Sequence, residues 1–338
     1  MMKKSIDMNP ESIVILRALQ LGDMLCAVPA WRALRASFPE ARIALVGLPW
    51  AHEFVDRFKR YLDDFIEFPG FPGLPERPAQ SRRIPAFLEQ IQSRNFDLAL
   101  QMHGSGQVTN PLISLFNARC TAGFYREGEY CPDERYFMQY PDELPEVNRH
   151  LRLMEHLRFP LQGEDLEFPI QEGDRAEFHS LKKSTGLRTD SYVCIHPGAR
   201  AAERRWPAEW FARTADGLYQ RGLQVVLTGT EQEGDIVETV LNQMSRPALN
   251  LAGKTSLGTL AMLISKAEML VSNDTGVSHL ADALRTPSVI LFTASSPERW
   301  APKDRNLHRV IPWASAALPE LVLEEADRLL KEATVYAF

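Results

Sequence analysis

Cysteine is scarce in this chain of 338 residues, which holds only four. They are Cys26, Cys120, Cys131 and Cys194, and they show neither a Cys-x-x-Cys spacing nor a nearby histidine pattern. A zinc site, which needs closely spaced thiolate and imidazole ligands, is therefore not expected. In a chain of this size the four are typical of reduced, mostly buried thiols in a cytosolic protein.

Long apolar runs and an excess of basic charge are also missing. No stretch approaches the roughly 20 apolar residues that cross a bilayer, and the polar start, Met1 to Pro10, lacks the apolar core of a signal peptide. The 38 basic and 44 acidic residues give a net charge of −6, without a basic face for nucleic acid. We expect a cytoplasmic protein with no nucleic-acid partner, and work beside a membrane stays compatible with the sequence.

Three nucleotide or hydrolase signatures are absent. No Gly-x-Gly-x-x-Gly follows the first expected strand, and Gly104-Ser105-Gly106 lacks a third glycine in place. This disfavours a redox enzyme of the usual dinucleotide-binding type. The full Walker motif and the Gly-x-Ser-x-Gly motif are also missing, and the latter absence disfavours an α/β-hydrolase.

What the chain does contain is an alternation of apolar strand-like runs and amphipathic stretches, typical of parallel sheets covered on both faces. Strands are predicted at Ser12–Leu16, Ala41–Gly47, Phe65–Phe68, Leu98–Gln101, Thr121–Phe124, Tyr192–His196, Gln224–Thr228, Met269–Ser272 and Ser288–Thr293. Helices are predicted at Met24–Phe38, Ile84–Ser93, Pro207–Arg221, Gln232–Ser245, Leu257–Lys266 and Val277–Leu284.

The length suggests two domains, each large enough for its own core. The join is expected within residues 160–190, where prolines and a charged stretch precede a new strand. We divide the chain into an N-terminal Rossmann-like domain, residues 1–175, and a C-terminal one, residues 176–338. A last helix, expected over Leu318–Lys331, could pack back on the first domain.

The most informative stretch runs from Ser272 to His279 and reads Ser-Asn-Asp-Thr-Gly-Val-Ser-His. It joins an expected strand to the helix expected at Val277. A strand that breaks at a small-residue turn into a helix leaves N–H groups unpaired, and the helix dipole adds positive charge there. We expect a phosphate-bearing ligand at this carboxyl end of a parallel sheet. The alternative is that Asp274 or Thr275 simply caps the helix.

Three further polar turns fall at the ends of other expected strands. Gly22 and Asp23 open the first long helix, where Asp23 could be a general base or a capping carboxylate. Glu231 could bond a ribose or base edge, or complement a helix dipole. The loop after His196 either offers guanidinium groups to phosphate or is an exposed basic loop with Trp206 as a packing anchor. Its arginines are Arg200, Arg204 and Arg205.

Together these residues resemble the family 9 glycosyltransferases, whose best-known members are the lipopolysaccharide heptosyltransferases. The matching segments are Ile15-Leu16-Arg17, Leu21-Gly22-Asp23, Pro29-Ala30, Phe38-Pro39, Phe96–Gln101, His196-Pro197-Gly198, Arg204–Pro207, Gly229-Thr230-Glu231 and Asn273–His279. The resemblance implies an α/β GT-B fold, two Rossmann-like domains with parallel sheets facing across a cleft. It implies inverting transfer of a sugar from a nucleotide diphosphate donor, typically ADP-heptose, with no metal and no cofactor.

The resemblance also assigns roles by position. Asp23 matches the general base that deprotonates the acceptor hydroxyl, and Arg204 stands where heptosyltransferases often carry a lysine that contacts donor phosphate or sugar. Glu231 matches an acidic residue of the nucleoside pocket. The other donor-site residues are Gly22, Asp274, Thr275, Gly276 and His279. Negative charge that develops on the departing β-phosphate needs N–H groups and a cation, which these residue types supply.

The implied acceptor is a lipid-linked glycan of the lipopolysaccharide core or a related glycan, at the cytoplasmic face of the inner membrane, with a peripheral membrane contact. Gln101, His103 and Arg126 are candidates for acceptor contacts, and the alternative for each is ordinary loop chemistry. Arg204 in place of lysine, and a loop after the last strand without an early glycine, put the donor in question. The alternatives are another nucleotide sugar, an epimerase, or a non-catalytic sugar-nucleotide-binding protein.

Overall fold

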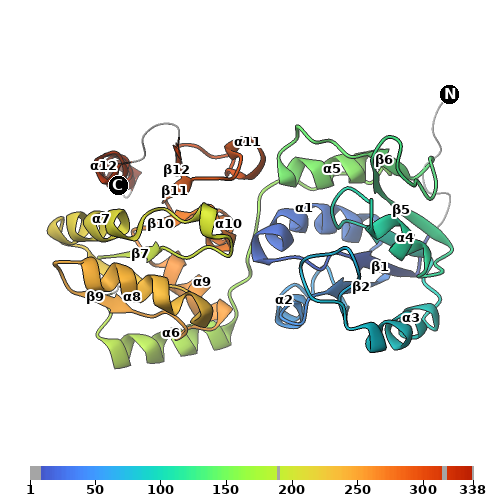
Figure 1. Cartoon of the computed structure of the whole chain (residues 1–338), viewed down its shortest axis with the longest axis horizontal. Helices are drawn as coiled ribbons and strands as arrows, with labels where there is room; N and C mark the ends of the chain where they lie inside the picture. The colour runs from blue at the N-terminus through green and yellow to red at the C-terminus, as the bar shows by residue number, and fades with distance from the viewer. Residues whose placement is uncertain (1–8, 189–190, 314–317, 337–338) are drawn as a thin grey trace. The chain divides into compact units, whose positions relative to one another are not determined.

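The computed structural model describes residues 9–188, 191–313 and 318–336, with side chains as far as Glu332. Most of the polar start from Met1 lies outside these residues. The chain forms two compact units, which meet in the sequence between Asp165 and Leu166 (Figure 1). This boundary precedes the expected one after residue 175, because the helix that begins at Glu172 packs on the second unit.

The first unit is one parallel sheet with the strand order β3-β2-β1-β4-β5-β6. Its strands are β1 Ser12–Leu16, β2 Arg42–Gly47, β3 Asp64–Glu67, β4 Leu98–Gln101, β5 Cys120–Tyr125 and β6 Phe137–Gln139. Its helices are α1 Leu21–Ser37, α2 Ala51–Arg57, α3 Ile84–Gln92, α4 Thr109–Ser114 and α5 Glu146–His156, with a short 3-10 helix η1 at Ser81–Arg83.

The second unit repeats this plan with the order β12-β11-β10-β7-β8-β9. Its strands are β7 Tyr192–His196, β8 Gln224–Leu227, β9 Ala248–Asn250, β10 Met269–Asn273, β11 Ser288–Phe292 and β12 His308–Pro312. Its helices are α6 Glu172–Thr185, α7 Ala208–Gln220, α8 Gly234–Gln243, α9 Leu257–Ser265, α10 Gly276–Ala283, α11 Pro297–Trp300 and α12 Pro319–Tyr336. The 3-10 helices η2 and η3 span Ala202–Arg204 and Glu231–Glu233.

The central strands are apolar almost throughout because helices cover both faces of each sheet. In β1, Val14 pairs with Ala44 of β2 and with Ala99 of β4, and all three side chains are fully buried. In β7, Cys194 pairs with Leu270 of β10, and both are again fully buried. Both sheets reverse their strand order between two central strands, and open α/β sheets bind ligands beyond the carboxyl ends of such strands.

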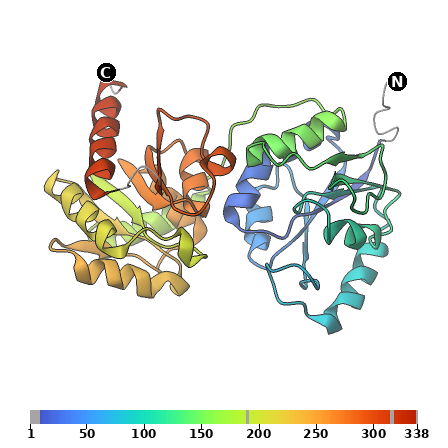
Figure 2. The same cartoon turned by 45° about the horizontal axis from the view of Figure 1, so that its top comes forward.

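The last helix, α12, packs within the second unit on α7 and β11 (Figure 2, red). Val322, Ala326 and Leu329 form its buried face in the core of that unit. The two helices approach closely at Gly217 of α7, where a Cβ atom would lie 2.7 Å from Cδ1 of Leu323. The sequence left open that this helix packs on the first domain. The core of the second unit already buries the apolar face of α12.

The composition predicted that no helix crosses a membrane and that the cysteines are reduced, and the described residues bear on both points. None of the helices there has the length and hydropathy to span a bilayer. All four cysteines lie in this part of the chain, and each is free of disulfides.

Candidate active site

In the second unit, the strand order reverses between β7 and β10, and both strands run into polar residues there. Asp274 follows β10 directly, and its N–H donates to the carbonyl of Leu291 at 3.0 Å, which continues the sheet pairing. The side chain of Asp274 is only 2 % exposed, yet its Oδ2 accepts no hydrogen bond from any described residue. A buried carboxylate oxygen without a donor is costly, so this atom is a candidate ligand contact.

The first turn of α10 is open beside it. Thr275 is the residue before the helix and is extended, with φ −157° and ψ 178°, and its side chain makes no capping hydrogen bond. The simple capping role considered for Thr275 is therefore not found. The N–H of Ser278 bonds to the carbonyl of Thr275 at 2.9 Å, which leaves the N–H groups of Gly276 and Val277 without an intrahelical acceptor. His279, in the same helix, is buried with its ring edge-on to Trp300.

A buried asparagine, whose role the sequence did not reveal, ties the two strand ends together. Asn273 is fully buried; its Oδ1 accepts from the N–H of Trp206 at 2.9 Å, and its Nδ2 donates to the carbonyl of Pro197 at 2.9 Å. Thr293 adds a hydrogen bond from its hydroxyl to the carbonyl of Glu203 at 2.9 Å. The loop between residues 197 and 206 is thereby fixed at the start of α10.

The arginines of this loop differ in what they contact. Arg205 donates from Nε to the carbonyl of Ala199 at 2.8 Å, so it supports the loop itself. Trp206 is 1 % exposed and packs on Phe211, which confirms it as a packing anchor. The half-buried side chain of Arg204 makes no hydrogen bond or ion pair with the rest of the described chain. Its guanidinium is therefore available to an anion.

The turn after β8 separates two neighbouring glutamates. Glu231 is exposed, and its carboxylate has no hydrogen-bond or ion-pair partner among the described residues. Glu233 turns back instead and accepts from the N–H of Thr230 at 2.8 Å and from its hydroxyl at 2.9 Å. Thr230 and Glu233 thus form a capping box at the start of η3, and Glu231 remains the acid that faces solvent.

Glu233 also faces His196 at the end of β7. Its Oε2 lies 3.5 Å from Nε2 of His196, whose Nδ1 is 3.1 Å from the hydroxyl of Thr228. Burial would raise the pKa of Glu233, but the hydrogen bonds from His196 and Thr230 outweigh it and lower the pKa to about 2. A Cβ at Gly198 would lie 2.3 Å from Oε1 of Glu233, so a larger residue there would have to displace this carboxylate from His196 and Thr230. The pair therefore fixes the start of the arginine-bearing loop.

In the first unit, the strand order reverses between β1 and β4, and α1 starts beside this point. The residue before α1 is Gln20, so Asp23 is the third residue of the helix and half-buried, not its capping residue. Gly22, just before it, is buried. The carboxylate thus sits at the positive end of a helix, at the carboxyl edge of the sheet.

Two of the three residues expected near an acceptor are buried at the end of β4. The side chain of Gln101 is fully buried; it donates to the carbonyl of His103 at 2.8 Å and accepts from the N–H of Phe124 at 3.2 Å. His103 is 4 % exposed, accepts from the N–H of Ala18 at Nδ1, and places Nε2 3.3 Å from Oε1 of Glu76. The partners of His103, which the sequence did not identify, are thus on neighbouring loops.

The third, Arg126, is exposed beyond β5. Its two terminal nitrogens both bond to the carboxylate of Asp142 at 2.7 Å, and its guanidinium lies over the ring of Tyr140. This pairing raises the pKa of Arg126 further, chiefly through the hydrogen bond to Asp142. Within the described residues, no group of three or more histidine, cysteine or acidic side chains could hold a metal ion.

Comparison with known proteins then identifies the family. The model of glycosyltransferase family 9 (heptosyltransferase) matches residues 84–333, which is most of the chain. The chain belongs to glycosyltransferase family 9. It is accordingly a glycosyltransferase, and the resemblance drawn from the sequence motifs is confirmed. The matched residues include Arg204, Glu231 and the start of α10, whereas Asp23 lies before them.

Relatives and solved structures extend the likeness over nearly the whole chain. Lipopolysaccharide heptosyltransferase 2 of Salmonella typhimurium is 26% identical, with 95% of this chain and 99% of the relative covered. A family 9 glycosyl transferase structure from Veillonella parvula superposes with a TM-score of 0.83 at 21% identity, covering 97% of this chain and 99% of that one. The ADP-heptose lipopolysaccharide heptosyltransferase II structure from E. coli gives 0.77 at 23% identity, covering 96% and 99%. The fold is thus the expected GT-B fold of two Rossmann-like units.

Proposed function

We propose that this enzyme transfers heptose from ADP-heptose to a lipopolysaccharide core acceptor, with inversion at the anomeric carbon and without a metal ion. One observation carries the donor site: the buried, unsatisfied Oδ2 of Asp274 lies beside the open first turn of α10. The names of the family relatives, which are lipopolysaccharide heptosyltransferases, support the choice of sugar and acceptor.

The donor chemistry follows from the residues at β7, β8 and β10. Cleavage of the anomeric bond leaves negative charge on the β-phosphate, which the open N–H groups of Gly276 and Val277 and the guanidinium of Arg204 stabilise. Asp274 accepts a hydrogen bond from a hydroxyl of the donor, which satisfies its buried oxygen. Glu231 binds the ribose of the nucleoside from the exposed end of β8. His279 completes the donor site from the first turns of α10.

On the acceptor side, Asp23 takes the proton from the attacking hydroxyl. A single base suffices for inversion, because the acceptor attacks the face opposite the departing phosphate. Gly22, in the same turn, lets the backbone come close to the donor. We place the glycan acceptor at the carboxyl edge of the first sheet, where Gln101 and His103 shape the β4 loop and Arg126 lies at its rim. Work at the cytoplasmic face of the inner membrane, with a peripheral contact, completes the proposal.

Isothermal titration with ADP-heptose tests the donor site, with UDP- and GDP-sugars for comparison and with EDTA present throughout. We expect ADP-heptose to bind best, and Asp274→Ala to weaken it about ten- to a hundred-fold, the value of a charge-assisted hydrogen bond. Asp235→Ala is the matched control, because Asp235 is an exposed acid in the first turn of α8. Unchanged binding by the Asp274 variant would remove that residue from the site, and preference for another nucleotide would replace the donor.

A further inference from the structure

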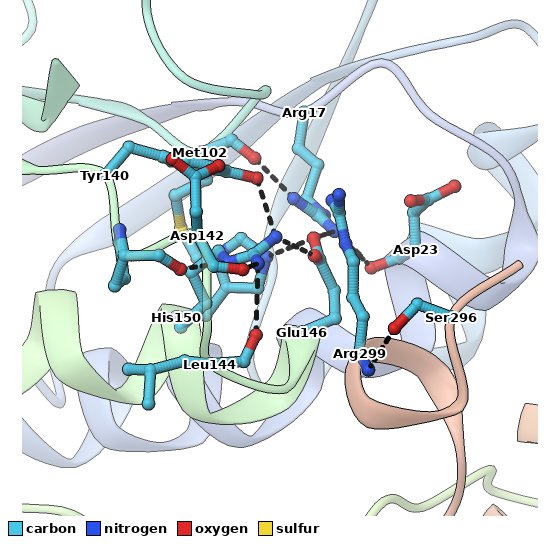
Figure 3. A network of polar contacts seen from close by, with 12 residues as sticks. Arg17, Asp23, Met102, Tyr140, Asp142, Leu144, Glu146, His150, Ser296 and Arg299 are labelled. Carbon is cyan, nitrogen blue, oxygen red and sulfur yellow. Dashed lines mark hydrogen bonds and ion pairs between the residues drawn. The ribbon is translucent and has the colours of Figure 1, made fainter. Parts of the chain in front are cut away.

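A fully buried arginine lies at the point where the first sheet reverses its strand order. Arg17 directly follows β1, and both Nε and Nη2 donate to the main-chain carbonyl of Asp23, at 3.0 and 2.6 Å. Its Nη1 donates to the carbonyl of Met102, which follows β4. Figure 3 shows this guanidinium with its hydrogen bonds to the two carbonyls. One side chain thus joins the ends of β1 and β4 to the first turn of α1.

A buried carboxylate extends this connection to another helix. Glu146, the first residue of α5, is 5 % exposed and places Oε1 3.4 Å from Nη2 of Arg17. Its Oε2 accepts from Arg149 at 2.8 Å, and Nε2 of His150 lies 3.2 Å from Oε1. Burial, with the nearby charge of Arg17, lowers the pKa of His150 to about 4. His150 is therefore neutral at pH 7, and Glu146 is shared by two guanidinium groups.

Arg149 fixes the chain that leads into α5. Its guanidinium donates to the carbonyls of Pro141, Asp142 and Leu144 at 2.8 to 3.0 Å. The loop before α5, α5 itself and the first turn of α1 are thus held by one set of buried charges (Figure 3). Such groups are expensive to bury, and apolar side chains of similar size often stabilise a core as well or better. What they add is a fixed geometry, because guanidinium forks bond in few orientations.

We propose that Arg17 is a positioning residue for Asp23, acting with Glu146 to hold the first turn of α1 where its carboxylate meets the acceptor hydroxyl. Arg17 has no exposed surface and cannot contact the acceptor itself. Arg17 holds the main-chain carbonyl of Asp23. Only two side-chain torsions separate the main chain of Asp23 from its carboxylate. A displacement of about 1 Å at a reacting group can cost on the order of a hundred-fold in rate. The inference rests on the proposed role of Asp23 as the base.

Arg17→Lys tests the proposal, because lysine keeps the charge and loses the fork. The assay measures the release of ADP from ADP-heptose. The acceptors are a set of lipopolysaccharides, each truncated at a different sugar of the core. We expect kcat to fall about ten- to a hundred-fold, while KM for ADP-heptose stays within about three-fold. Glu146→Gln, which keeps the shape and removes the charge, should lower kcat in the same sense by less. It also carries the test if Arg17→Lys does not fold.

Arg35→Lys is the matched control at the other end of α1. Arg35 also binds main-chain carbonyls and one acid, Asp63, and its side chain is 16% exposed. Equal losses of kcat in the Arg17 and Arg35 variants would show general destabilisation and overturn the proposal. A wild-type kcat in both Arg17→Lys and Glu146→Gln would overturn it as well.

Asp23→Asn separates this proposal from the one on which it rests. Loss of transfer in Asp23→Asn together with the expected fall in Arg17→Lys supports both. Loss in Asp23→Asn with normal kcat in the Arg17 variant overturns only the positioning role. Normal transfer in Asp23→Asn would remove the base and, with it, the reason for positioning.

Discussion

At the scale of single residues, His150 makes the stability of the first unit depend on pH. Its side chain is buried and its pKa is lowered to about 4, whereas an unfolded histidine takes up a proton near 6.5. Between these values the unfolded chain binds more protons, so stability falls as the pH drops. We expect about 2 kcal/mol of the free energy of unfolding to be lost between pH 7 and pH 5.

Urea unfolding of the wild type and of His150→Gln at both pH values measures this loss. The glutamine variant cannot take up the proton in either state, so its dependence on pH should be weaker by the same amount. His52→Gln is the control, because His52 belongs to the same unit and is exposed. Equal pH dependence in wild type and His150→Gln would contradict the prediction.

The sequence predicted residue types better than it predicted their orientation. The turn Gly229-Thr230-Glu231 was identified, but the capping box that Glu233 forms with Thr230 was not. The sequence does not distinguish a glutamate that closes a capping box from one that faces a ligand. The role of Asn273 was missed for a similar reason. Its hydrogen bonds reach back to a loop some 70 residues earlier in the chain, and local sequence carries no sign of that contact. The sequence also assigned Arg17 no role of its own. It appeared only as the last residue of the matching segment Ile15-Leu16-Arg17.

At the scale of elements, the arginine-bearing loop depends on Asn273. Asn273→Ala would leave the N–H of Trp206 and the carbonyl of Pro197 buried without partners, at about 1–3 kcal/mol for each group. We expect a lower melting temperature and several-fold weaker binding of ADP-heptose, because Arg204 is no longer held in place. Differential scanning fluorimetry and titration on one preparation measure both effects.

Asn250→Ala is the control for that loss. The amide of Asn250 bonds to Glu238 and to the N–H of Ala252 at the end of β9, and it makes no hydrogen bond to that loop within the described residues. It should lower stability without changing donor affinity. Donor affinity that is equally reduced by both substitutions, or by neither, would argue against a specific role of Asn273.

The central elements were predicted almost residue by residue, whereas three of the four edge strands were not predicted. The predicted bounds of β1, β4 and β7 agree with the structure, because strands buried on both faces are continuous apolar runs. The strands β6, β9 and β12 were missed. All three are outer strands, and β6 and β9 have only three residues each, too few to show a pattern. Ligand sites lie at the centre of such sheets, so these omissions did not affect the site.

At the scale of the whole molecule, each unit has its own sheet and core, and the two should unfold separately. Calorimetry should resolve two transitions that can be assigned independently. ADP-heptose should raise the temperature of one transition by mass action, since the proposed donor residues lie in the second unit. Lowering the pH from 7 to 5 should lower the other, through His150. One transition that responds to both changes would show that the units unfold together.

The close approach of α7 and α12 at Gly217 sets a limit on sequence variation. In a library that randomises this position, any side chain would require Leu323 to shift, so selection for folded protein should favour glycine. Substitution of the facing Leu323 by alanine would make room, and small residues at position 217 should then be recovered. The residues recovered at position 217 thus show whether α12 packs against α7, and no assay of sugar transfer is needed.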